Sequence, residues 1–134
     1  GRNPIVAHEY LGDSVEGKTV FIADDIIASG ESMLEVASNL KTRGAKRIIA
    51  DATFPLFTSG LDKFDKAVEE GTLDYVVGTN LTYRKPELLN RDWYVDVDVS
   101  KYAAYFIVAL NHDMSVSSII DPIKKIEALL ANRK

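Results

Sequence analysis

Short apolar runs alternate along the chain with segments in which apolar residues recur at helical spacing. The runs predict four β-strands, at Lys18 to Asp24, Lys46 to Thr53, Asp74 to Gly78 and Trp93 to Val99. The first of these is a continuous β-prone run, so we expect a buried strand. The last alternates strictly between apolar and polar residues, which predicts a strand with one exposed face.

The segment after the first strand has the periodicity of an amphipathic helix. From Ser32 onwards, apolar residues recur at i, i+3, i+4 and i+7, and Gly44 is positioned to end the helix. These apolar residues are Met33, Val36, Ala37 and Leu40. We expect them to face the core.

Three more helices are predicted towards the C-terminus. The first runs from Gly60 to Glu70 and is ended by Gly71, and the last opens at Asp121 and Pro122, a pairing typical of a helix start. The residues expected to face inward are Leu61, Phe64, Ala67 and Val68 in the first helix, and Ile123, Ile126 and Leu130 in the last. The second helix is lined by Tyr102, Tyr105, Phe106 and Ala109, and its aromatic residues are expected to be core or a subunit interface. Strands that alternate with helices indicate an α/β fold of three layers, with a mostly parallel sheet flanked by helices.

Composition and charge narrow the classes of function. The 134 residues suit a single domain, residues 1–134, and the net charge of −4 offers no basic surface to nucleic acid or to an anionic membrane. The absence of cysteine excludes disulfides, thiolate zinc sites and a cysteine nucleophile. No apolar run approaches the roughly 20 residues of a membrane span. We therefore expect a soluble, cytoplasmic protein, and the missing initiator methionine leads us to expect a piece of a longer polypeptide.

A segment near the N-terminus matches the P-loop pattern GxxxxGK[ST]. It runs from Gly12 to Thr19, with the sequence GDSVEGKT. A P-loop follows a strand and opens a helix, whose N-terminus helps to bind the phosphates. Here Lys18 and Thr19 open a β-prone strand instead. We therefore interpret the segment as a surface turn, with Gly17 in a tight position and Lys18 in solvent.

The most informative stretch lies at the end of the first strand, where Asp24 and Asp25 stand side by side. Ligands of parallel sheets bind beyond the carboxyl ends of the strands. Ionised carboxylates accept hydrogen bonds, so this pair suits the vicinal hydroxyls of a ribose. The loop from Ala28 to Ser32 then leads into a helix N-terminus, which offers free N–H groups and a positive dipole end to a phosphate. Gly30 lets the backbone approach such a ligand closely.

The same residues also have a purely structural interpretation. Ser32 and Glu35 have the S-x-x-E spacing of a capping box, Ser29 and Gly30 suit a simple turn, and the two aspartates could be solvated. Residue chemistry alone leaves both interpretations open. No metal site is indicated, because His8 is not followed by a second histidine at the HExxH spacing.

The stretch VFIADDIIASGES resembles the phosphoribosyl-pyrophosphate signature of type I phosphoribosyltransferase folds: an apolar strand, two acidic residues and a small-residue phosphate loop. The stretches GDSVEGKTVFIADD, LKTRGAKRIIADATFPLFTSG and HDMSVSSII resemble ribose-phosphate diphosphokinases, the phosphoribosyl pyrophosphate synthetases. The similarity covers nearly the whole chain in order and is greatest to a divergent bacterial branch. It implies a type I phosphoribosyltransferase-like domain that forms the C-terminal half of such an enzyme.

This resemblance implies an activity and a site. The family transfers the β,γ-diphosphate of ATP to the 1-hydroxyl of ribose 5-phosphate, with Mg²⁺ bound alongside ATP. By matching position, Asp24 and Asp25 would contact the ribose hydroxyls. The 5-phosphate loop would consist of Ala28, Ser29, Gly30, Glu31 and Ser32. The family's catalytic Lys/Arg loop lies N-terminal to the signature, so we expect this chain alone to bind ribose 5-phosphate weakly and to be inactive. The family also implies homo-oligomers that assemble from dimers into hexamers.

Two residues depart from the family pattern. Glu31 places a negative charge beside the expected phosphate, and Phe54 stands where these enzymes often have histidine. Two other functions therefore stay open. One is a nucleobase phosphoribosyltransferase, although we see no extra segment that would cover the base. The other is a non-catalytic, synthetase-associated regulatory subunit, which Glu31 favours.

Overall fold

The computed structural model describes residues 12–132, apart from the side chains of residues 118, 124 and 125, and the chain divides into two units at residues 97 and 98. The elements of the first unit are β1 (Thr19–Ile27), α1 (Glu31–Thr42), β2 (Arg47–Pro55), α2 (Asp62–Glu69), β3 (Tyr75–Thr79), α3 (Pro86–Leu89) and β4 (Tyr94–Val97). Those of the second unit are α4 (Ser100–Asn111), α5 (Ser117–Ile120) and α6 (Ile123–Ala131).

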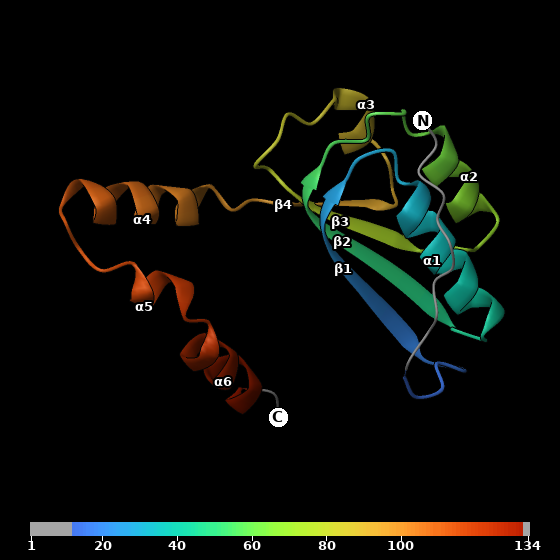
Figure 1. The fold of residues 1–134 in the computed structure, drawn as a ribbon, viewed down its shortest axis with the longest axis horizontal. Helices are drawn as coiled ribbons and strands as arrows, with labels where there is room; N and C mark the ends of the chain where they lie inside the picture. Colours follow the sequence, from blue (N-terminus) through green and yellow to red (C-terminus); the bar gives the residue numbers. More distant parts are fainter. Residues whose placement is uncertain (1–11, 133–134) are drawn as a thin grey trace. The chain divides into compact units, whose positions relative to one another are not determined.

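Within residues 12–97 the strands form one sheet in the order β1-β2-β3-β4, and every neighbouring pair is parallel. α1 connects β1 to β2 and α2 connects β2 to β3, as Figure 1 shows. The predicted βαβ units and α/β fold are therefore confirmed, with strand bounds that differ from the predicted ones by one to three residues. Because the strands are parallel, their carboxyl ends lie at one edge of the sheet, where ligands of such folds bind.

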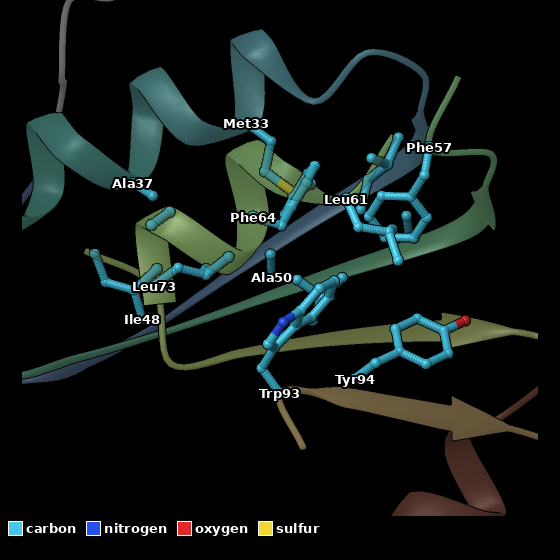
Figure 2. Close-up of a cluster of buried hydrophobic side chains, with 14 of the residues drawn as sticks. Met33, Ala37, Ile48, Ala50, Phe57, Leu61, Phe64, Leu73, Trp93 and Tyr94 are labelled. Atoms are coloured by element: carbon cyan, nitrogen blue, oxygen red, sulfur yellow. The ribbon is translucent and has the colours of Figure 1, made fainter. Parts of the chain in front are cut away.

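One face of the sheet packs against α1 and α2. Figure 2 shows Met33 and Ala37 of α1 and Phe64 of α2 gathered over Ile48 and Ala50 of β2. None of these five side chains is more than 4 % exposed. The inward-facing positions predicted for the two helices are all buried or partly buried, which confirms them. Since burying a large apolar side chain stabilises by about 1.5–3 kcal/mol, this layer fixes the helices on the sheet.

The other face of the sheet is left open by residues 12–97. Phe21 is 59 % exposed, Tyr75 39 %, Val95 43 % and Val97 37 %. The expectation that the first strand is buried is therefore wrong. β1 is an edge strand, and α1 and α2 both lie on the opposite face of the sheet, so no helix of residues 12–97 covers its outward residues (Figures 1 and 2). The apolar residues of the alternating pattern in β4 lie on this same open face.

Gly44 ends α1, as the sequence predicts. Its φ is +86°, in the left-handed region that favours glycine. Its N–H donates to the carbonyl of Lys41 at 2.9 Å, and the N–H of Ala45 donates to the carbonyl of Leu40 at 3.1 Å. This pair of hydrogen bonds satisfies carbonyls that a helix end otherwise leaves free.

The segment GDSVEGKT is a turn before β1, which confirms the interpretation against a P-loop. Gly17 has φ +68° and donates its N–H to the carbonyl of Gly44 at 2.8 Å. Lys18 is exposed, and Thr19 is the first residue of β1. The segment therefore opens a strand and has no helix N-terminus to bind a phosphate.

The second unit is helical, and its last helix differs from the prediction. The N-cap residue is Pro122 and not Asp121, so the predicted helix start is wrong by one residue, although Asp121 Oδ1 does accept the N–H of Ile123 at 3.0 Å. Within residues 98–132 the expectation that Ile123, Ile126 and Leu130 face inward is not met, because these side chains are 59 %, 49 % and 60 % exposed. In α4, Ala109 is buried and Phe106 half-buried, but Tyr102 and Tyr105 are exposed. Among the described residues, no helix has the length and apolarity needed to cross a membrane.

Candidate functional site

The predicted phosphate loop joins the carboxyl end of β1 to the N-terminus of α1. The loop after β2 fastens it in place. Leu56 and Phe57 donate their N–H groups to the carbonyl of Ile27 at 2.9 and 3.1 Å, and Thr58 donates to the carbonyl of Ala28 at 2.9 Å. The start of the candidate site is thus held by three backbone hydrogen bonds before any ligand binds.

Gly30 is required at its position in this loop. It is buried, with φ +81°, a conformation that side chains other than glycine rarely adopt. A Cβ at this position would lie closer than 3.0 Å to two ring carbons of Phe64, which is 0 % exposed. The glycine therefore lets the loop lie directly on the ring of a core phenylalanine from α2.

The start of α1 leaves amide groups free for an anion. The first intrahelical hydrogen bond runs from the N–H of Leu34 to the carbonyl of Gly30 at 3.0 Å. The N–H of Glu31 makes a long hydrogen bond of 3.4 Å to Ser29 Oγ, and the N–H groups of Ser32 and Met33 have no acceptor among the described residues. Free amides and the positive end of the helix dipole together suit a phosphate.

The capping-box interpretation of Ser32 and Glu35 is wrong. The N-cap residue is Gly30, no side chain caps the helix, and Ser32 is already the second helical residue. The helix begins at Glu31, two residues earlier than a cap at Ser32 would place it, and its N-cap Gly30 packs on Phe64. The hydroxyl of Ser32 is thus not used as a cap.

Glu31, the departure from the family pattern, forms an ion pair. Its Oε1 lies 2.5 Å from Nζ of Lys63 on α2. The two side chains are 65 % and 49 % exposed, so the pair contributes little to stability. Its consequence is electrostatic: the Lys63 ammonium offsets a carboxylate that would otherwise repel a phosphate at the start of α1.

Asp24 and Asp25 lie within β1, because the strand continues to Ile27. Asp24 is in register with Ala52, which is buried beneath the helices, so Asp24 lies on the helix side and Asp25 on the open side of the strand. Asp24 Oδ1 accepts the N–H of Asp25 at 2.8 Å. Both side chains are exposed, and neither pairs with a cation among the described residues. One sugar could meet both carboxylates only across the edge of β1.

A family model matches this chain over residues 4–121, which is most of its length. Its description is the phosphoribosyl synthetase-associated domain. The chain belongs to this family. The membership agrees with the resemblance that its sequence motifs indicate. The match includes the end of β1, residues 28–30 and the start of α1, which together we call the β1–α1 joint.

Curated relatives are similar to this chain in sequence, and a solved structure shares its fold. The chain is 30 % identical over 111 residues to a ribose-phosphate pyrophosphokinase of Vibrio cholerae, covering 83 % of this chain and 34 % of that protein. It is 41 % identical over 68 residues to an orotate phosphoribosyltransferase of Oceanobacillus iheyensis, covering 51 % and 32 %. A phosphoribosylpyrophosphate synthetase from Mycobacterium smegmatis shares the fold, with a TM-score of 0.65 and 24 % identity over 76 % of this chain and 33 % of that one. The chain spans about a third of the length of the curated relatives it matches.

Sequence reasoning missed the residues of α2 that fix the loop. Lys63 pairs with Glu31, and the next residue, Phe64, lies against Gly30. These partners are more than 30 residues apart, and no periodicity connects them. The negative charge of Glu31 beside the expected phosphate is a local signal that a cation lies near it, but it does not identify Lys63.

A second contact network ties α2 to the segment before β4. Asp65 accepts hydrogen bonds from Arg91 Nε at 2.9 Å, from Arg91 Nη2 at 2.8 Å and from Trp93 Nε1 at 2.7 Å. Burial raises the pKa of Asp65, but the hydrogen bonds from Arg91 and Trp93 and the guanidinium charge outweigh it, so the pKa lies below its ordinary value. This network joins Asp65 to Arg91 and Trp93, and the ring of Trp93 stacks on Phe64 at 5.9 Å.

The described residues provide no metal centre of their own. No three histidine, aspartate or glutamate side chains of residues 12–132 are grouped closely enough to hold an ion. His8, the histidine weighed for a zinc site, lies outside the described residues. Any Mg²⁺ at this site would therefore need most of its ligands from phosphates and water, as is usual for this ion.

Proposed function

We propose that this chain binds ribose 5-phosphate or phosphoribosyl pyrophosphate as a domain of a ribose-phosphate diphosphokinase. The observation that carries the proposal is the β1–α1 joint. There Gly30 packs on Phe64 and the amides of Ser32 and Met33 have no acceptor among the described residues. Family membership supports the same class of substrate.

In this proposal the 5-phosphate lies against the loop, and the ribose lies over the end of β1. The loop consists of Ala28, Ser29, Gly30, Glu31 and Ser32. The backbone amides and the serine hydroxyls donate hydrogen bonds to the phosphate oxygens. Asp24 and Asp25 accept hydrogen bonds from the ribose hydroxyls, one from each side of the strand.

The parent enzyme would join this sugar to a diphosphate. The 1-hydroxyl of ribose 5-phosphate attacks the β-phosphorus of ATP and loses its proton. The bond from that phosphorus to the α,β-bridging oxygen breaks, and AMP leaves. Mg²⁺ would accompany ATP and neutralise phosphate charge. We expect the catalytic Lys/Arg loop to come from outside residues 12–132, and the parent to be a cytoplasmic homo-oligomer, dimer-based and up to hexameric. The chain alone would be inactive.

Calorimetry with ribose 5-phosphate tests the binding proposal. We expect weak, saturable binding that is lost in the double variant Asp24→Asn, Asp25→Asn, while circular dichroism shows an intact fold. Each single variant should weaken binding by itself, because the carboxylates lie on different sides of β1. Unchanged binding in the double variant would contradict the proposal. Formation of AMP by the chain alone would contradict its expected inactivity.

Two other functions each have one observation in their favour. The similarity to an orotate phosphoribosyltransferase favours a nucleobase phosphoribosyltransferase, which would release pyrophosphate from phosphoribosyl pyrophosphate only when a base is present. The description of the matching family favours a non-catalytic, synthetase-associated subunit. An assay of the parent protein with ATP and ribose 5-phosphate separates the latter from the leading proposal, because only a diphosphokinase forms AMP.

A further inference from the structure

Within residues 12–97, two neighbouring apolar side chains are exposed where β1 and β2 end. Ile26 of β1 is in register with Phe54 of β2, and the two side chains are 44 % and 39 % exposed. The residues that follow them, Ile27 and Pro55, are fully buried. Since neighbouring residues of a strand point to opposite faces, Ile26 and Phe54 point away from the core. We refer to these two residues as the apolar pair.

The apolar pair lies between the two halves of the proposed ribose 5-phosphate site. Ile26 directly follows Asp24 and Asp25, and the phosphate loop begins two residues later, at Ala28. Phe54 is opposite Ile26 on β2, the strand beside β1 in Figure 1, and adjacent strands lie about 4.8 Å apart. A sugar that is held by the aspartates and has its 5-phosphate on the loop therefore crosses Ile26 and comes beside Phe54.

Ribose has a polar edge and an apolar face. Its hydroxyls project from the ring, whereas the C–H bonds gathered on one face offer no hydrogen-bond donor or acceptor. An aromatic ring attracts such C–H bonds, because the face of its π-system carries the negative end of the ring quadrupole. Small-molecule sites combine apolar and aromatic walls with a few polar groups that fix the orientation of the ligand. Here Asp24 and Asp25 provide the polar groups, and Phe54 provides the aromatic wall.

The core of the first unit does not require the ring of Phe54. The buried side chains of β2 are Ile48, Ala50, Ala52 and Pro55. Phe54 belongs neither to the buried hydrophobic cluster nor to the partly buried residues packed against it. Its ring can therefore pack against a ligand without disturbing the core.

We propose that Phe54 is a specificity-determining residue of the sugar site. Its ring packs on the C–H face of the ribose while Asp24 and Asp25 accept hydrogen bonds from the hydroxyls, and Ile26 extends the apolar surface towards the phosphate loop. Phe54 thereby favours a phosphorylated furanose over a phosphate that carries no sugar ring. The inference rests on the proposed function, because it assumes that ribose 5-phosphate occupies the β1–α1 joint.

NMR titrations with ribose 5-phosphate and with inorganic phosphate test the inference, since inorganic phosphate reports on the loop alone. Phe54→Ala should weaken ribose 5-phosphate binding by roughly three- to tenfold, the effect of losing one aromatic contact, and should leave phosphate binding unchanged. Phe54→Tyr keeps the ring and should bind ribose 5-phosphate like the wild type. The ring current should also shift the ribose proton signals upfield in complexes of the wild type and Phe54→Tyr, but not in the complex of Phe54→Ala.

Phe21→Ala is the matched control. Phe21 is 59 % exposed on β1, five residues before Ile26 and so about 16 Å away along the strand, and its loss should leave the binding of both ligands unchanged. Circular dichroism checks that each variant is folded.

The outcomes separate this inference from the proposed function. Ribose 5-phosphate binding that is lost in the double variant Asp24→Asn, Asp25→Asn but unchanged in Phe54→Ala would overturn the inference and leave the proposed function standing. Equal weakening of ribose 5-phosphate and phosphate binding in Phe54→Ala would also overturn the inference, because the ring would then act on the loop and not on the sugar. A wild type that binds no ribose 5-phosphate would overturn both.

Discussion

Replacing Gly30 with alanine is the sharpest perturbation of the β1–α1 joint. The new Cβ would lie closer than 3.0 Å to two ring carbons of Phe64. Phe64 cannot move aside easily, because it is fully buried and its ring is stacked at 5.9 Å on Trp93 and packed edge-on at 4.9 Å against Phe57. The substitution also places a Cβ at φ +81°. It therefore has a conformational cost and a steric cost.

The two costs can be estimated separately. A residue other than glycine in the left-handed region costs about 1–2 kcal/mol. Overpacking a well-filled core costs a further 1–3 kcal/mol or so. We therefore expect Gly30→Ala to lower the free energy of unfolding by roughly 2–5 kcal/mol, and to weaken ribose 5-phosphate binding because the loop must shift. Urea denaturation followed by circular dichroism measures the first effect, and calorimetry the second.

Gly71→Ala is a matched control. Gly71 has φ +70°, but a Cβ there would meet no atom within 4 Å. Only the conformational cost of about 1–2 kcal/mol should appear, with no change in ligand binding. Adding Phe64→Leu to Gly30→Ala should recover part of the lost stability beyond additivity, because it removes the clash. Equal losses for the two glycine variants, or strict additivity in the double variant, would refute the steric argument.

Three further predictions concern charges near the site. Lys63→Met should weaken ribose 5-phosphate binding by roughly two- to fivefold, since the Lys63 ammonium no longer offsets the charge of Glu31, and adding Glu31→Gln should restore binding. Calorimetry of both variants checks this. Because the pKa of Asp65 is lowered in the folded state, the stability that its carboxylate provides is present above its ordinary pKa near 4 and is lost as the pH falls. The difference in stability between the wild type and Asp65→Asn should therefore shrink when urea denaturation is measured at acid pH. Burial raises the pKa of Tyr94 to about 12, so the wild type should lose stability between about pH 10 and pH 12 while Tyr94→Phe does not. At neutral pH, thermal denaturation should show that Tyr94→Phe is no less stable than the wild type. The buried hydroxyl of Tyr94 has no hydrogen-bond partner among the described residues, so its removal breaks no hydrogen bond.

The strands of the first unit and its helices α1 and α2 could be predicted because local patterns carry them, whereas the short helix α3 was not predicted. Apolar runs mark the strands, and i, i+3, i+4 spacing marks α1, where Met33 and Ala37 are buried as expected. Gly44 ends the helix through hydrogen bonds that involve only its neighbours. The edge position of β1 could not be predicted in this way. Strand order depends on pairings between distant segments. The apolar sequence of β1 is compatible both with an edge strand and with a central strand.

The candidate site was predictable in its location but not in its support. Asp24, Asp25 and the following loop lie in one short stretch, so a sugar-phosphate site there could be predicted from the sequence. The same stretch also fits a capping box at Ser32, and local spacing could not decide between the two. Phe64 lies 34 positions beyond Gly30 in the sequence, and its ring leaves no room for a Cβ at Gly30, a contact that local spacing cannot predict.

Amide NMR spectra of the protein titrated with ribose 5-phosphate test the central proposal most directly. We predict that the largest saturable shifts occur at the N–H groups of Ser32 and Met33, which have no acceptor among the described residues. Smaller shifts should follow at Asp24 and Asp25. Saturable binding that leaves the amides of Ser32 and Met33 unmoved, or a complete absence of binding, would contradict the proposal that this loop holds the 5-phosphate.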